Sequence, residues 1–186
     1  MLKFKGQSSL IDSIRAVLDR IKAKATVGLA LITTAQGKFF SNGIDLAWTL
    51  SDPSHRPLMD SKLKSLVFDL FNLPMPTIAA ITGHASAGGF ILEPSHDYII
   101  MRKDRGFLYM SEIDIGLKIP AWSVILVKQG IVDSAHVGAA ETMKEAVKLG
   151  EKLVSRKWDG KVYAHNRRLV FSDVLVALTN VSVSRL

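Results

Sequence analysis

The sequence predicts an α/β fold, in which helices alternate with buried strands along a chain of 186 residues. Two patterns indicate this class. Several long segments carry apolar residues at the spacing of one helix face, and several short segments are continuous apolar runs, typical of buried strands. Apolar residues make up 48% of the chain and charged residues 22%, which is enough to build the core of a folded domain.

Helical spacing predicts four long helices. The pair Ser8-Ser9 caps the first, and Pro74 and Pro76 end the second, because a proline disfavours helical backbone in the residue before it. The long helices are expected over residues 9–23, 59–72, 139–154 and 163–178, with shorter ones after residue 90 and from residue 119.

Short apolar runs predict the strands. The run over residues 27–34 is rich in β-forming residues and is expected to be buried on both faces of a sheet. The polar segment 52–57 contains prolines and is expected to be a mobile loop. Further strands are expected over residues 78–81, 98–101 and 107–110, with a brief extended piece at 130–133.

The stretch Pro76–Phe90 is the most informative part of the chain. Its apolar run ends at Thr82, and the small residues Ala85–Gly89 then lead into a second apolar run that opens a helix. A helix start behind a small-residue turn offers free backbone N–H groups to an anion, or to an oxygen that becomes one during a reaction. Close packing of a helix on a strand explains the same residues, and the stretch alone does not decide between the two.

Composition excludes several classes of function. The chain has no cysteine, so disulfides, thiol catalysis and cysteine metal sites are excluded, and no metal or dinucleotide motif is present. No metal or redox cofactor and no membrane span are expected. The net charge of +7 suits a phosphorylated ligand, a membrane surface or nucleic acid, but the basic residues are scattered, so nucleic-acid binding is disfavoured.

The C-terminal tripeptide resembles a targeting signal. Ser184, Arg185 and Leu186 form a conservative variant of the Ser-Lys-Leu signal, which a peroxisomal import receptor recognises at a free C-terminus. We therefore expect a peroxisomal location.

Three sequence blocks follow one another along the chain: Gly37–Leu46, Pro76–Gly89, and His96–Met101 followed by Phe107–Gly116. Together with Gly130–Asp133 they resemble the crotonase (enoyl-CoA hydratase/isomerase) superfamily. The residues at 110–112 and 119–122 are most similar to those of plant peroxisomal enoyl-CoA isomerases. The resemblance implies a crotonase-like ββα spiral core over residues 1–122 and a C-terminal helical region over 123–186. Relatives of this kind are usually trimers or hexamers, so the resemblance also implies a possible homo-oligomer.

The resemblance implies a site that binds an acyl-CoA, in which coenzyme A is part of the substrate. Two backbone N–H groups, those of Ile44 and Gly88, would form an oxyanion hole for the thioester oxygen. Asp45 follows the first donor and is expected to be a turn or cap residue. The residues expected to contact the substrate are Ser41, Asn42, Gly43, Gly89 and Trp122.

The number of catalytic carboxylates distinguishes hydratases from isomerases within the family. Hydratases of the family use two glutamates, but this chain has Ile91 at the first position and Glu112 at the second. A single carboxylate suits the transfer of a proton from C2 to C4 of one bound chain, which converts a 3-enoyl-CoA to a 2-trans-enoyl-CoA. Without the resemblance, Glu112 is better explained as a carboxylate of a surface loop.

Other interpretations stay open. His84, Ser86, His96 and Asp97 suggest a nucleophilic triad, although scattered polar residues beside a turn are more often structural. Relative to the family, the chain lacks the opening strands and a group of helices after residue 122, so a shortened member is expected. The pair Glu93-Pro94 also falls within an expected apolar helix. The alternative function is therefore an impaired member that binds acyl-CoA or a partner without turnover.

Overall fold

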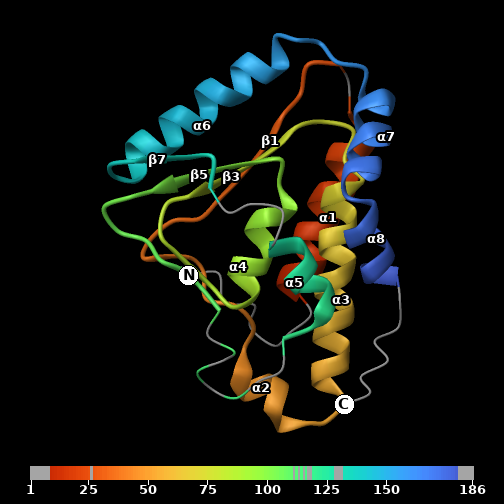
Figure 1. The fold of residues 1–186 in the computed structure, drawn as a ribbon, viewed down its shortest axis with the longest axis vertical. Coiled ribbons are helices and arrows are strands. Elements are labelled where there is room, and N and C mark those ends of the chain that lie inside the picture. The colour runs from red at the N-terminus through yellow and green to blue at the C-terminus, as the bar shows by residue number, and fades with distance from the viewer. Residues whose placement is uncertain are drawn as a thin grey trace.

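The computed structural model describes residues 9–25, 27–110, 112, 114, 116, 119–127 and 132–179 (Figure 1). The strands are β1 Leu31–Thr34, β2 Phe39–Ser41, β3 Thr77–Ile81, β4 His84–Ser86, β5 Tyr98–Arg102, β6 Leu108–Tyr109 and β7 Ser134–His136. The helices are α1 Ser9–Ala23, α2 Leu46–Ser51, α3 His55–Phe71, α4 Gly88–Leu92, the 3₁₀ turn η1 Glu93–Ser95, α5 Ala121–Val127, α6 Ala139–Val154, α7 Gly160–Val170 and α8 Ser172–Thr179. Among these helices, none combines the length and the apolar character that crossing a membrane requires.

The strands form two parallel sheets that the chain visits in turn. The larger sheet has the order β1-β3-β5-β7 and the smaller one the order β2-β4-β6. Each turn of the chain therefore adds one strand to the large sheet, one to the small sheet and then at least one helix. This repeat is the ββα spiral, so the predicted fold class is confirmed.

Alternate residues of the large sheet face different helices. On the central strand β3, Ile78 and Ala80 pack with Ala146 and Leu153 of α6, whereas Ala79 and Ile81 lie in the cluster built by α1 and α3. All of β3 is buried, as expected for a strand covered on both faces. Figure 1 shows α6 on one side of this sheet and α1, α3, α7 and α8 grouped on the other.

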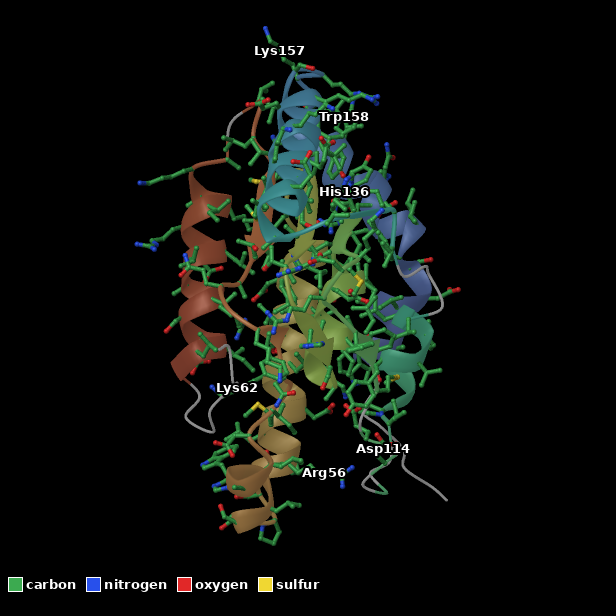
Figure 2. All side chains as sticks on the ribbon, turned by 90° about the vertical axis from the view of Figure 1, so that its left-hand side faces the viewer. Arg56, Lys62, Asp114, His136, Lys157 and Trp158 are labelled. Atoms are coloured by element: carbon green, nitrogen blue, oxygen red, sulfur yellow. The ribbon has the colours of Figure 1, made fainter. Side chains whose placement is uncertain are left out.

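Figure 2 shows the long axis of the molecule from a second side. Arg56 and Lys62 of α3 lie toward one end, and Lys157 and Trp158, just after α6, lie at the other. Lys62 also joins α3 to α1, because its Nζ lies 2.8 Å from a carboxylate oxygen of Asp12.

The helix predictions hold with two corrections. The helices at 9–23 and 139–154 are confirmed as α1 and α6. The helix predicted over 163–178 is two helices, α7 and α8, which separate at Phe171, where the ring packs 4.6 Å from that of Phe71. The segment 52–57 is not wholly a loop, since α3 already begins at His55 and Pro57 fits its first turn.

The strand predictions need two further corrections. The run over 27–34 forms only the short strand β1, which is half-buried because it stands at the edge of the large sheet. The residues His84–Ser86 were expected in a turn but form β4, the centre of the small sheet. Small residues suit a strand here because a second backbone segment packs directly against it. The piece predicted at 130–133 lies partly outside the described residues.

A buried arginine connects the C-terminal helices to the sheets. Arg167 of α7 is 5% exposed, and its Nε lies 2.8 Å from Asp97 Oδ1 as an ion pair. Its terminal nitrogens donate to the Leu70 carbonyl, to Thr77 Oγ1 and to the Ser95 carbonyl. The division into regions 1–122 and 123–186 stays a prediction; β7 pairs with β5, and residue 122 lies within α5.

The pair Glu93-Pro94 is accommodated by a change of helix type. α4 ends at Leu92, and Pro94 lies in the first turn of η1, where a missing N–H is tolerated. Glu93 is 1% exposed, and neither carboxylate oxygen has a hydrogen-bond partner. Burial therefore raises the pKa of Glu93 to about 8, which keeps the side chain protonated and neutral near pH 7.

This burial predicts how stability depends on pH. The pKa of Glu93 is higher in the folded chain than in the unfolded one, so its contribution to the free energy of unfolding is full below about pH 4.5. It then declines as pH rises to about 8. We expect Glu93→Gln to remove this decline and to be more stable than the parent at pH 9, by up to about 5 kcal/mol. Denaturant unfolding at several pH values measures the difference.

The matched control is Glu151→Gln, which changes an exposed glutamate of α6. Its unfolding curve should follow that of the parent at every pH. Parallel pH profiles for Glu93→Gln and the parent would contradict the assignment.

Candidate active site

The residues expected to act on a substrate all follow strands of the small sheet. Ile44 comes three residues after β2, Gly88 two after β4, and Glu112 three after β6. Because these strands are parallel, their carboxyl ends meet at one edge, a usual place for a site in α/β folds. The strand order places the segment of Gly88 between the other two.

The two expected backbone donors come from segments in close contact. A Cβ atom added to Gly43 would lie 3.0 Å from Gly88 N and 2.7 Å from Ala87 Cβ, and Gly43 itself has φ of +76°. A larger residue at Gly43 would therefore push the two segments apart. The segments that carry Ile44 and Gly88 therefore meet, and the role of their N–H groups as an oxyanion hole stays a prediction.

Ala87 has an unusual backbone conformation directly before Gly88. Its φ of 52° and ψ of −123° are sparsely populated for a residue with a side chain. Since ψ of Ala87 orients the peptide plane that carries the Gly88 N–H, this conformation sets the direction of the donor. Strain of this kind is common where a backbone group has a function.

The predicted contact residues around the donors have structural partners. Ser41 is buried, and its hydroxyl accepts a hydrogen bond from Gly43 N at 3.2 Å. Asn42 is exposed, and its Oδ1 lies 3.4 Å from Ser86 Oγ. A Cβ at Gly89 would lie only 2.6 Å from the Ser41 carbonyl oxygen. Their contact with a substrate stays a prediction, but all four residues shape this edge of the sheet.

Asp45 is a cap, as predicted. Its carboxylate accepts a hydrogen bond from Trp48 N at 3.1 Å, and it immediately precedes α2. An N-cap of this kind fixes where the helix begins and therefore holds the backbone beside Ile44.

Glu112 has the properties of a carboxylate that can exchange a proton. One of its oxygens, Oε2, is buried and has no hydrogen-bond partner, and burial raises the pKa of the side chain. A raised pKa brings a carboxyl closer to the working range of a general base. The side chain is half-buried, and its role as a base stays a prediction.

A hollow of about 470 Å³ adjoins this edge of the small sheet. Asn42 and Ser86 line it together with four aromatic side chains and with Lys38 and Leu108. The ring of His84 stacks on that of Phe107 at 5.2 Å and lies 5.4 Å from that of Phe39.

The possible nucleophilic triad is not assembled. His96 is buried and neutral, because burial lowers its pKa to about 4; its Nδ1 donates to backbone carbonyls and its Nε2 accepts from Thr33 Oγ1. Asp97 is paired with Arg167, and the ring of His84 is stacked on Phe107. In the described part of the chain, no group of three or more His, Asp or Glu side chains is placed to hold a metal ion.

Trp122 is buried next to Ile91, in a cluster formed by α3, α4, α5 and α8. Its indole Nε1 donates a hydrogen bond to Asp60 Oδ1 of α3 at 3.2 Å. The sequence analysis did not identify Asp60, because no pattern links a polar residue of one helix to a tryptophan 62 positions away.

Comparison with known proteins shows the family of this chain. Residues 7–132 match the enoyl-CoA hydratase/isomerase family. The chain belongs to this family. It is 49% identical over 195 residues to peroxisomal enoyl-CoA delta isomerase 1 of Arabidopsis thaliana, covering 90% of this chain and 81% of that protein. The second peroxisomal isomerase of that plant is 43% identical, covering 88% of this chain and 82% of that protein.

Solved structures of the family share the fold. An enoyl-CoA hydratase/isomerase family protein from Pseudomonas syringae matches with a TM-score of 0.82 and 21% identity, covering 95% of this chain and 84% of that one. The enoyl-CoA isomerase of Mycobacterium tuberculosis matches with a TM-score of 0.79 and 20% identity, over 92% and 83% of the two chains. These structures confirm the fold, and the two plant relatives confirm the resemblance to plant peroxisomal isomerases.

The close contact between Gly89 and the Ser41 backbone can be tested by adding a methyl group at Gly89. We expect Gly89→Ala to lower the free energy of unfolding by about 1–3 kcal/mol, because the new methyl group overlaps the Ser41 backbone. The control is Gly150→Ala in α6, where the added Cβ meets Ile32 Cδ1 at an ordinary 3.5 Å and helix propensity favours alanine. Equal stability of the two variants in urea unfolding would refute the close approach.

Proposed function

We propose that the chain converts 3-enoyl-CoA to 2-trans-enoyl-CoA during fatty-acid β-oxidation. The observation that carries the proposal is the half-buried Glu112, with an unpartnered oxygen, at the edge of the small sheet where the two donor segments meet. Membership of the family and the similarity to plant delta isomerases support the same reaction.

In this reaction the thioester oxygen accepts hydrogen bonds from the N–H groups of Ile44 and Gly88. Glu112 takes a proton from C2, and the electron pair of that C–H bond enters the π system as the thioester becomes an enolate. The two backbone donors stabilise the negative charge on oxygen, and each such donor is worth roughly 100- to 1,000-fold in rate. Glu112 then returns its proton to C4, so the double bond moves from C3–C4 to C2–C3.

The residue at the other family position argues against hydration. Ile91 is 4% exposed and packs against the apolar cluster of Trp122, so it cannot activate water. Addition of water needs an acid and a base at the two ends of the double bond. One carboxylate is sufficient for a proton transfer that begins and ends on the same bound chain.

A variant of Glu112 tests the role of the base. We expect Glu112→Gln to lower kcat for a 3-enoyl-CoA by about 100- to 10,000-fold, while the dissociation constant of a saturated acyl-CoA stays within about threefold. The parent rate should rise with pH through the raised pKa of Glu112, because only the ionised carboxylate accepts a proton. Spectroscopic isomerase assays and calorimetric binding measure the two quantities.

The matched control is Asp114→Asn, two residues along the same loop. Asp114 is exposed, and Figure 2 shows it below α5. The isomerase rate of Asp114→Asn should equal that of the parent. Full activity of Glu112→Gln would refute the proposed base, whereas tight binding without any parent turnover would favour the impaired member of the family.

We also propose that Ser184, Arg185 and Leu186, which lie outside the described residues, direct the chain to peroxisomes. Two plant relatives named as peroxisomal support this location. A fluorescent tag at the N-terminus should show peroxisomal spots that disappear when these three residues are deleted. Unchanged spots after the deletion would refute the signal.

A further inference from the structure

We propose that Trp122, held in place by Asp60, limits the length of the acyl chain that the site accepts. The inference rests on the proposed function, since it assumes that an acyl-CoA binds with its thioester oxygen at Gly88. Trp122 is then a residue that determines specificity, and Asp60 is a positioning residue that acts through it.

The positions of the donors and the base set the direction of the acyl chain. Gly88 begins α4, and Ile91 lies one turn further on the same face of that helix. Glu112 lies in the segment that leads from β6 to α5. The proposal requires that an acyl chain with its oxygen at Gly88 and its C2 and C4 at Glu112 continues between α4 and α5, two helices that contact each other.

That space is filled by side chains. Ile91, Trp122 and Leu126 are 4%, 2% and 0% exposed, and they pack together in one apolar cluster. Leu63 and Val67 of α3 close the cluster from the third side. The hollow beside Asn42 and Ser86 has a different lining, which includes neither Ile91 nor Trp122.

The indole of Trp122 is held in place by the ion pair of Asp60 and Lys64. Trp122 Nε1 donates to Asp60 Oδ1, and Asp60 Oδ2 lies 3.0 Å from Lys64 Nζ one turn along α3. The side chains of Asp60 and Lys64 are only 31% and 17% exposed. A shift of the ring away from Asp60 would leave a buried N–H without its acceptor, which is unfavourable.

This arrangement favours short acyl chains. Each methylene that a site buries tightens binding by about fourfold. In this protein the gain in affinity stops when the acyl tail reaches the indole, because further carbons of the tail must displace Trp122 or remain in water.

The test measures the binding of saturated acyl-CoAs, which requires no turnover. Dissociation constants of butanoyl-, hexanoyl-, octanoyl- and decanoyl-CoA are determined by titration calorimetry. We expect the affinity of the parent to level off before decanoyl-CoA. In Trp122→Ala the affinity should continue to rise with the length of the acyl chain. The ratio of the affinity for decanoyl-CoA to the affinity for butanoyl-CoA should therefore exceed that of the parent by at least about tenfold.

Three further variants make the result specific. Ile91→Ala enlarges the same space and leaves the indole unchanged. It replaces Trp122→Ala in the test if that variant does not fold. Asp60→Ala should shift the chain-length profile toward that of Trp122→Ala, whereas Asp60→Asn keeps an oxygen acceptor and should retain the parent profile. The matched control is Trp158→Ala, because Trp158 lies at the other end of the molecule (Figure 2) and should leave the profile unchanged.

Each outcome decides the inference separately from the proposed function. Parent affinity that rises through decanoyl-CoA, or one profile shared by the parent, Trp122→Ala and Ile91→Ala, would overturn it. Absence of acyl-CoA binding by the parent would overturn it as well. A length limit that Trp122→Ala removes would support it even if the parent fails to isomerise 3-enoyl-CoA, a result that would refute the proposed function alone.

Discussion

The close approach of the β2 and β4 segments is the constraint on which the rest of the site depends. At three places, Gly83, Gly43 and Gly89, an added Cβ would lie 2.4–2.7 Å from an atom of the facing segment. Real side chains do not tolerate such distances, so glycine at these points allows the two strands and their following loops to pack backbone to backbone. These loops carry Ile44 and Gly88, the two proposed donors, and they are held together by the packing of main chain rather than by flexible side chains.

The outer parts of the fold hold this edge of the small sheet in place. α2 is capped by Asp45 directly after the first donor, and η1 follows the helix that begins at the second. Arg167 hydrogen-bonds the Ser95 carbonyl at the end of η1 and pairs with Asp97, so α7 supports the same helix from the opposite end. The C-terminal helices therefore belong to the structural support of the site, although they contribute no donor or base.

Local patterns in the sequence were enough to place most elements and the order of the site residues. Amphipathic spacing identified α1 and α6 correctly. The family resemblance, rather than a local pattern, pointed to Ile44 and Gly88 as donors, which stays a prediction. The misplaced features depend on contacts between distant residues. β4 is a strand because it pairs with β2 and β6, and α7 separates from α8 where Phe171 meets Phe71. The hydrogen bond from Trp122 to Asp60 has the same origin, since it joins two helices that no local pattern relates.

The buried Glu93 couples folding to proton uptake. At neutral pH its carboxyl binds a proton in the folded chain, because the pKa is about 8, but the same group is ionised in the unfolded chain. Each molecule that folds between pH 4.5 and 8 therefore removes up to one proton from the solvent at this position. Newly made chains consequently gain more from folding in an acidic compartment than in an alkaline one, and the heat of unfolding includes the ionisation heat of the surrounding buffer.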